Sequence, residues 1–158
     1  MPFLDLGAAY RELKPEIDAA VSRVLESGWY ILGPEVEAFE AEWAAYCDAK
    51  HAVGLANGLD ALTLALRALD IGPGDEVIVP SNTYIATWLA VTGVGATPIP
   101  VEPDVATHNI DVARIEAAIT SRTRVLLPVH LYGQPADMDP ILDIAKRHRL
   151  RVIEDAAQ

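Results

Sequence analysis

The stretch VIVPSNTYIATWLAVTGVGATPIPV, residues 77–101, decides the fold class of this chain. Residues 77–79 are wholly apolar and lack the polar alternation of a half-exposed strand, so they predict a strand buried on both faces. Residues 84–92 then predict a helix, and residues 97–101 a second buried strand. A strand, a crossover helix and another strand make a parallel pair, which indicates an α/β fold.

The same stretch carries no charged residue and is long enough to cross a membrane. Proline, glycine, serine, asparagine and threonine interrupt it, with Pro80 and Pro98 among them. Such residues favour two buried strands and a short helix over a membrane span. We therefore expect no contact with a membrane.

The alternation of strands and helices continues outward from this stretch. Further strands are expected at 51–55, 125–129 and 151–154, and further helices at 59–69, 112–119 and 139–148. This order predicts a mostly parallel sheet with helices on both faces. The last strand is followed at once by the end of the chain, at the edge of the sheet where α/β proteins bind ligands, so we expect a first part of a longer protein.

Two amphipathic helices precede this pattern. The first contains Pro15 in its first turn and ends at Gly28, and the second begins after Gly33 and Pro34. The loop between them, residues 28–34, is apolar and aromatic. Either it packs within its own domain, or a partner subunit or a ligand covers it.

Composition and charge exclude several classes of protein. An apolar share of 51% in 158 residues suits one packed domain and excludes a disordered chain. The net charge of −11 argues against a nucleic-acid partner, although it does not exclude one local anion site built from backbone N–H groups. One cysteine and a start without a basic signal region suit a cytoplasmic protein, and that cysteine count excludes a multi-cysteine metal site, so we expect no metal.

Residues 57–61, Asn-Gly-Leu-Asp-Ala, join an expected strand to the start of a helix. A glycine there lets a ligand approach the backbone, and the free N–H groups of the first turn, with the helix dipole, suit a phosphate. The alternative is an ordinary strand–helix turn with a polar cap. The spacing is not that of a dinucleotide-binding motif.

Three further positions lie where strands end. Asp155 follows the last strand and could hold a proton on a ring nitrogen of a cofactor, or cap a following helix. Tyr84 opens the helix after residues 77–79 and could lie flat against a planar ligand, or belong to the core. His130 ends the strand at 125–129, where a hydrogen-bonded structural role is the alternative to catalysis.

These positions converge on one edge of one sheet, and at the same time four segments carry a family resemblance. Residues 33–40, 72–80, 129–138 and 154–158 resemble the sugar-nucleotide aminotransferases of the DegT/DnrJ/EryC1/StrS family. The resemblance implies the aspartate aminotransferase fold, type I among pyridoxal-phosphate enzymes, and a homodimer with shared active sites. It also implies an N-terminal helical segment, residues 1–50, that packs on the large domain and the partner, and the first part of the cofactor-binding large domain in residues 51–158.

The resemblance assigns roles to five residues. Gly58 and Leu59 match the backbone that holds the phosphate of pyridoxal 5'-phosphate, and Tyr84 matches the aromatic residue that stacks on its ring. Asp155 matches the catalytic acid that pairs with the ring nitrogen and keeps the ring an electron sink. Gln158 matches the amide near the ring hydroxyl. The family usually has threonine at position 59, so a hydroxyl contact is lost here.

One part of the family's machinery is absent from this sequence. The family attaches its cofactor to a lysine beyond the position of Asp155, and the only lysines here are Lys14, Lys50 and Lys146, at unsuitable positions. Glu154 is expected to face away from the site and to be structural.

The function implied is transfer of an amino group from an amino acid, glutamate by expectation, to a keto-deoxysugar nucleotide. Residues 57–61 look more like the members that aminate C3 of the hexose than those that aminate C4. Two alternatives stay open: a dehydratase that has histidine in place of the lysine, and a non-catalytic fragment used for binding or regulation.

Overall fold

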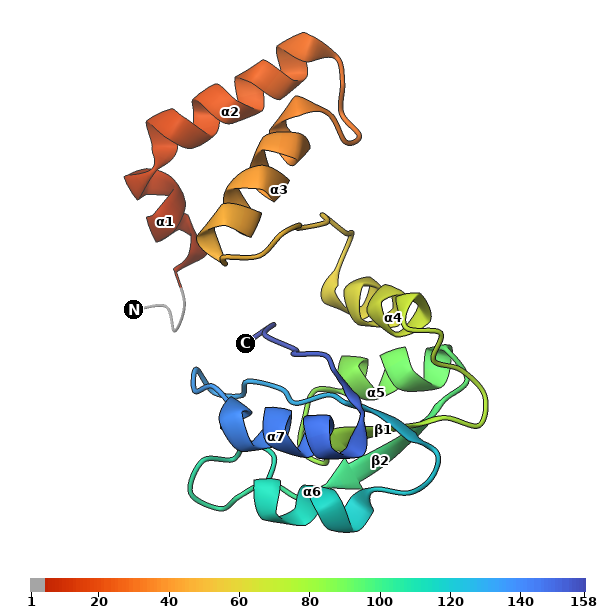
Figure 1. Cartoon of the computed structure of the whole chain (residues 1–158). Helices are drawn as coiled ribbons and strands as arrows, with labels where there is room; N and C mark the ends of the chain where they lie inside the picture. The colour runs from red at the N-terminus through yellow and green to blue at the C-terminus, as the bar shows by residue number, and fades with distance from the viewer. Residues whose placement is uncertain (1–4) are drawn as a thin grey trace. The chain divides into compact units, whose positions relative to one another are not determined.

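The computed structural model describes residues 5–158, which form two compact units that divide between Gly54 and Leu55. The first unit is helical, with α1 (Leu6–Glu12), α2 (Lys14–Ser27) and α3 (Pro34–Tyr46). The helices α2 and α3 lie side by side (Figure 1), and Arg23 Nε donates to Glu35 Oε1 across them at 2.8 Å. Pro15 in the first turn and Gly28 in a left-handed C-cap bound α2 as the sequence predicts.

The second unit contains a four-stranded parallel sheet in the order β2-β1-β3-β4. Its elements follow one another as α4 (Gly58–Ala68), β1 (Glu76–Pro80), α5 (Ile85–Gly93), β2 (Thr97–Val101), α6 (Val112–Ala118), β3 (Thr123–Leu126), α7 (Met138–His148) and β4 (Arg151–Val152). The alternation of strands and helices and the parallel pairing are confirmed. No helix described within residues 5–158 has the length and apolar character to cross a membrane.

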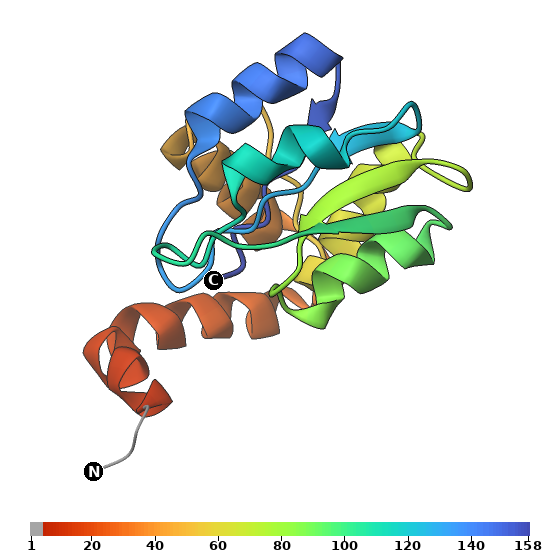
Figure 2. The same cartoon turned by 90° about the horizontal axis from the view of Figure 1, so that it is seen from below.

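Helices cover both faces of this sheet, and each face has its own core (Figure 2). Val77 and Val79 of β1 point to the core beneath α4 and α5, where Leu66 is fully buried. Ile78, between them, points to the core beneath α6 and α7 with Ile141. The apolar run at 77–79 is thus explained by burial on both sides, because successive strand residues face opposite ways.

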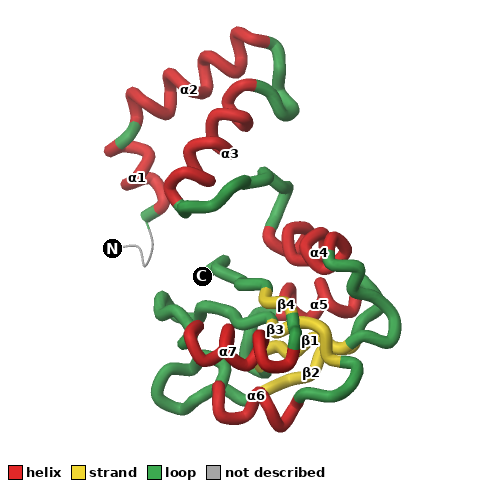
Figure 3. Tube along the Cα trace, in the orientation of Figure 1, coloured by secondary structure: helices red, strands yellow, loops and turns green. Residues whose placement is uncertain are grey.

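Two strands differ from the prediction. Residues 51–55 form no strand but a loop (Figure 3), and Val53 is exposed. A strand needs a neighbour for its N–H and C=O groups, and no strand described here pairs with this run. The second strand, β2, was expected to be buried but is partly exposed, because it is the edge of the sheet, where Pro98 and Pro100 are tolerated.

The other differences concern the ends of elements. Regular pairing of β3 stops at Leu126, since Pro128 has no N–H to donate, yet the chain continues alongside β4 and Val129 bridges Asp155. The short helix α1 was not predicted from the sequence. Asp5 caps it by accepting from Gly7 N at 3.1 Å, and none of its residues is buried, so no apolar periodicity marks it.

Candidate functional site

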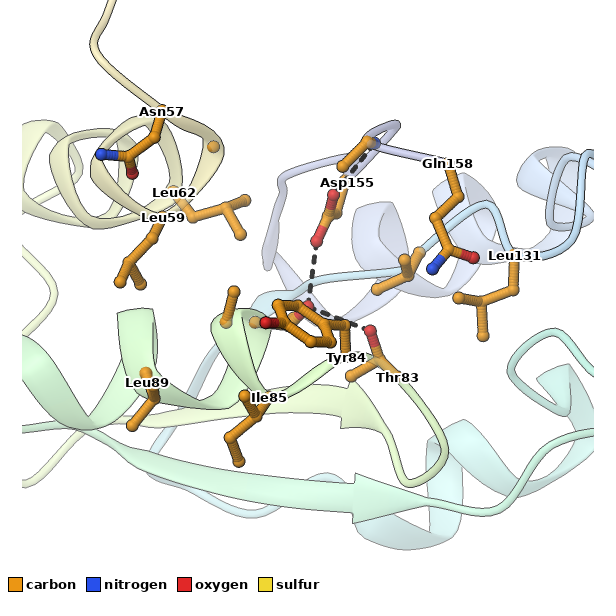
Figure 4. Close-up of a pocket in the computed structure, with 15 residues that line it drawn as sticks. Asn57, Leu59, Leu62, Thr83, Tyr84, Ile85, Leu89, Leu131, Asp155 and Gln158 are labelled. Atoms are coloured by element: carbon orange, nitrogen blue, oxygen red, sulfur yellow. Dashed lines mark hydrogen bonds between the residues drawn. The ribbon is translucent and has the colours of Figure 1, made fainter. Parts of the chain in front are cut away.

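A cavity of about 530 Å³ opens at the carboxyl-terminal edge of the sheet. The close-up in Figure 4 shows its lining, in which α4 faces α5 and the segment after β4. The lining residues are Asn57, Gly58, Leu59, Leu62, Thr83, Tyr84, Ile85, Ala86, Thr87, Leu89, Val129, Leu131, Asp155, Ala157 and Gln158. All five site residues predicted from the sequence are therefore brought together in one cavity.

The first turn of α4 forms one wall of the cavity. Asn57 is the N-cap, and its Oδ1 accepts from Asp60 N at 2.9 Å, while Ala61 N donates to Asn57 O at 3.1 Å. The two N–H groups ahead of these, on Gly58 and Leu59, have no acceptor among the described residues. These are the unpaired donors that a helix N-terminus offers to an anion.

Gly58 leaves open space in front of those donors. A Cβ built on Gly58 meets no heavy atom within 4 Å. In a helix the Cβ tilts toward the N-terminus, so a side chain at this position would occupy the approach to the free N–H groups. Glycine therefore keeps open a cradle that a larger residue would fill, which fits a phosphate group.

Asp155 is held on the opposite side of the cavity. Its backbone continues the sheet, since His130 N donates to Asp155 O and Asp155 N donates to Pro128 O, both at 3.0 Å. Its side chain is buried in the lining, where Oδ2 accepts from Thr87 Oγ1 at 2.9 Å and Oδ1 accepts from Ala157 N at 3.2 Å. A buried carboxylate is costly unless it is hydrogen-bonded or paired with a positive charge, so this site suits a cationic N–H group.

Tyr84 presents its ring to the same cavity, below Asp155 in Figure 4. It is the N-cap residue of α5, in extended conformation, and 70% of its surface is exposed. The alternative of a core aromatic is therefore wrong. An uncovered aromatic face in a cavity with apolar walls suits a planar ring.

His130 and Glu154 lie outside the lining of this cavity. His130 Nδ1 accepts from Ala136 N at 3.0 Å, so its proton is assigned to Nε2, which lies 3.1 Å from Glu154 Oε2. Both ring nitrogens are thus occupied within the fold. These contacts agree with the structural alternative for His130, and Glu154 lies away from the cavity lining as expected, while the roles of both residues stay predictions.

Among the described residues, 5–158, no lysine lines the cavity. Of the three lysines, Lys14 begins α2, Lys50 follows α3, and Lys146 lies in the last turn of α7.

Sequence reasoning missed Thr83 and Thr87. Thr87 is 1% exposed and donates to Asp155, and its hydroxyl lies 3.0 Å from that of Thr83. No signal in the sequence indicates this contact, because Thr83 precedes the N-cap of α5 and the bond from Thr87 to Asp155 joins residues 68 positions apart.

Comparison with known proteins places these features in a family. The profile of the DegT/DnrJ/EryC1/StrS aminotransferase family matches residues 11–158. The chain is 65% identical over 158 residues to the dTDP-3-amino-3,4,6-trideoxy-alpha-D-glucose transaminase of Streptomyces venezuelae, covering 100% of this chain and 42% of that protein.

Solved structures show the same fold. The crystal structure of DesV from S. venezuelae in complex with a ketimine intermediate matches with a TM-score of 0.97 and 66% identity, covering 99% of this chain and 42% of that one. NtdA from Bacillus subtilis with bound cofactor PMP matches with a TM-score of 0.94 and 40% identity, covering 100% of this chain and 37% of that one. This chain thus spans less than half the length of these proteins.

The parallel sheet, the cavity at its edge and these matches agree. The fold is that of the pyridoxal-phosphate-dependent aminotransferases, of which the chain covers a part. The chain belongs to the DegT/DnrJ/EryC1/StrS aminotransferase family.

Proposed function

We propose that the protein containing this chain is a pyridoxal-phosphate-dependent aminotransferase that acts on a nucleotide-linked keto-deoxysugar. The observation that carries this proposal is the cavity itself. It combines unpaired N–H groups at the start of α4, an uncovered aromatic ring and a buried carboxylate, which are complementary to a phosphate, a flat ring and a protonated ring nitrogen.

Each part of the cofactor has residues that would hold it. The N–H groups of Gly58 and Leu59 would hold the phosphate, Tyr84 would cover one face of the ring, and the carboxylate of Asp155 would accept a hydrogen bond from the protonated ring nitrogen. Gln158, at the rim of the cavity, would bind the ring hydroxyl. The PMP of the related NtdA structure is the amino form of the same cofactor, which supports this assignment.

The chemistry at this site follows from the charge on Asp155. When bound, the cofactor supplies an electron sink for negative charge that develops beside it. Asp155 keeps the ring nitrogen protonated, which makes that sink effective, while the apolar residues around it, Leu62, Val129 and Leu131, exclude water from the hydrogen bond. The same low-dielectric surroundings strengthen the ion pair between carboxylate and ring.

The proposal for the sugar substrate rests on the similar transaminase of S. venezuelae and on residues 57–61, at the start of α4. The name of the S. venezuelae transaminase contains a 3-amino sugar, and the similarity to that protein extends over all 158 residues of this chain. Together with the segment at 57–61, this supports amination at C3 rather than C4, with glutamate as the amino donor. Such a reaction takes place in the cytoplasm, where nucleotide sugars are made.

Two elements of the active enzyme are proposed to come from elsewhere. We propose that the lysine that attaches the cofactor lies outside this sequence, which is supported by the absence of Lys14, Lys50 and Lys146 from the cavity lining. A partner subunit completes the site in a homodimer and contacts residues 1–50. The exposed aromatic loop supports this, since Trp29 and Tyr30 are 59% and 65% exposed.

The experiment is amino transfer by the purified full-length protein loaded with pyridoxal phosphate. With glutamate and a dTDP-linked 3-keto-6-deoxyhexose we expect an amino sugar, detected by mass spectrometry, and an equal amount of 2-oxoglutarate. The 4-keto isomer tests the preference for C3. Loss of water from the sugar without gain of nitrogen would instead identify a dehydratase and refute the proposal.

A further inference from the structure

A chain of two hydroxyl groups leads to the carboxylate of Asp155, and its threonines, Thr83 and Thr87, also belong to the cavity lining. Thr87 is in the first turn of α5, and its Oγ1 lies 2.9 Å from Asp155 Oδ2 and 3.0 Å from Thr83 Oγ1. The dashed lines of Figure 4 follow this chain from Thr83 to Asp155. Thr87 and Asp155 are 68 residues apart in the sequence, so their hydrogen bond joins two distant segments of the chain.

The direction of this chain follows from counting protons. An ionised carboxylate only accepts hydrogen bonds, so Thr87 is the donor to Asp155. A hydroxyl carries one proton, so Thr87 has none left for Thr83 and must accept from it. The order is therefore Thr83 to Thr87 to Asp155, and hydrogen bonds aligned in this way strengthen one another.

The burial of Thr87 shows that this contact is built into the fold. Thr87 is 1% exposed, so water does not replace its hydroxyl, whereas Asp155 reaches the cavity. With Oδ2 bound to Thr87 and Oδ1 bound to Ala157 N, the carboxylate is fixed at both oxygens, and Asp155 still belongs to the cavity lining.

We propose that Thr87 is a positioning residue that, with Thr83 behind it, orients the carboxylate of Asp155 to accept the N–H of the cofactor ring. This inference rests on the proposed function, because it requires a ring nitrogen at Asp155. Thr87 is 1% exposed, and its hydroxyl is already bonded to Asp155 and Thr83. Its effect passes through Asp155, so it is specific to ligands that carry that nitrogen.

The test compares two ligands in the full-length apoprotein: pyridoxal phosphate, and its deaza analogue, in which carbon replaces the ring nitrogen. For Thr87→Val, which removes the hydroxyl and keeps the shape, we expect the Kd for pyridoxal phosphate to rise about tenfold, the scale of one hydrogen bond to a charged group. The Kd for the deaza analogue should change less than about twofold. Thr87→Ser, which keeps the hydroxyl, should restore the wild-type ratio of the two constants.

Two further variants test whether the change in Kd is specific to the hydroxyl chain at Asp155. Thr92→Val is the matched control, because Thr92 is on the same helix and its hydroxyl bonds only to the carbonyls of Trp88 and Leu89. Thr83→Val removes the outer link at a less buried position and should give a smaller change of the same sign, so it replaces Thr87→Val if that variant does not fold.

The outcomes separate the two proposals. If wild-type protein binds neither ligand, the proposed function fails. If wild-type binds pyridoxal phosphate and Thr87→Val weakens both ligands equally, or neither, the positioning role of Thr87 is refuted and the proposed function stands. Selective weakening with recovery in Thr87→Ser supports the inference.

Discussion

Replacing Gly58 by alanine should weaken cofactor binding without lowering the stability of the fold. The added Cβ meets no heavy atom within 4 Å, and the backbone of Gly58 does not need a positive φ. In the middle of a helix alanine is favoured over glycine by about 0.5–1 kcal/mol, and at Gly58, the first residue of α4, the gain is smaller, so the substitution should leave the free energy of unfolding nearly unchanged or slightly higher. The same methyl group points toward the helix N-terminus and enters the space in front of the free N–H groups.

The loss of binding can be worked out from the donors that the phosphate would lose. Only Gly58 N and Leu59 N are unpaired in this turn, among the described residues, so each carries a large share of the contact. A hydrogen bond to a charged group contributes about 1.5–3 kcal/mol. Displacing the anion from one donor should therefore raise the Kd about 10- to 100-fold, and Gly58→Val should raise it further.

The assay is titration of pyridoxal phosphate into full-length apoprotein, together with thermal unfolding of the same samples. Gly93→Ala is the matched control, since a Cβ there also meets nothing within 4 Å and Gly93 ends α5 outside the cavity lining. It should leave the Kd unchanged. If Gly58→Ala binds as tightly as the wild type, the phosphate is held elsewhere and the reasoning about this cradle is wrong.

Three other predictions concern single side chains. Leu59→Thr adds a hydroxyl beside the free N–H groups and should tighten cofactor binding by no more than about tenfold, since a neutral hydrogen bond contributes about 0.5–1.5 kcal/mol; a larger gain in the same titration would mean that the backbone is not the main donor. Asp155→Asn should keep the fold but lose most turnover, because an amide is a poor partner for a pyridinium proton; wild-type turnover with cofactor bound would remove Asp155 from the mechanism. The Thr120 hydroxyl and then the Arg122 guanidinium hold the pKa of Glu76 below its ordinary value of 4.5. A lowered folded pKa means that this contribution to stability is present above about pH 4.5 and is lost as the pH falls below it, so urea midpoints of Glu76→Gln should depend less on pH in that range than those of the wild type. Parallel curves for the two proteins would contradict this.

The sequence predicts the sheet well because its signals are local. The apolar run at 77–79 specifies burial on both faces whatever surrounds it, and Pro15, Gly28 and Asp111 mark helix ends through their own backbone and side-chain chemistry. The strand expected at 51–55 fails for the opposite reason. An apolar run becomes a strand only if another strand pairs with it, and that depends on segments distant in sequence.

The site likewise has features that local sequence signals predict and one contact that depends on distant segments. Gly58, Tyr84 and Asp155 are predictable because each stands at the carboxyl end of a strand or the start of a helix, where function collects in α/β proteins. Which partner holds Asp155 is not predictable in this way, since the hydrogen bond to Thr87 spans 68 residues. It requires the actual register of β4 beside β3, which places Asp155 next to Val129 and above α5.

The charge of the site now explains how an acidic chain can present an anion site. The chain carries a net charge of −11. Among the described residues, 5–158, the side chains that line the cavity include one carboxylate and no basic group. Positive potential comes from the dipole and free N–H groups of α4, which act over a single turn, whereas surface charges farther away are screened over about 8 Å at physiological salt. The one carboxylate, Asp155, is across the cavity from Gly58 and neutralises a cationic ring nitrogen rather than repelling the phosphate. A ligand with a negative end and a positive end is therefore matched at both, and an anion without the ring gains only the contacts at α4.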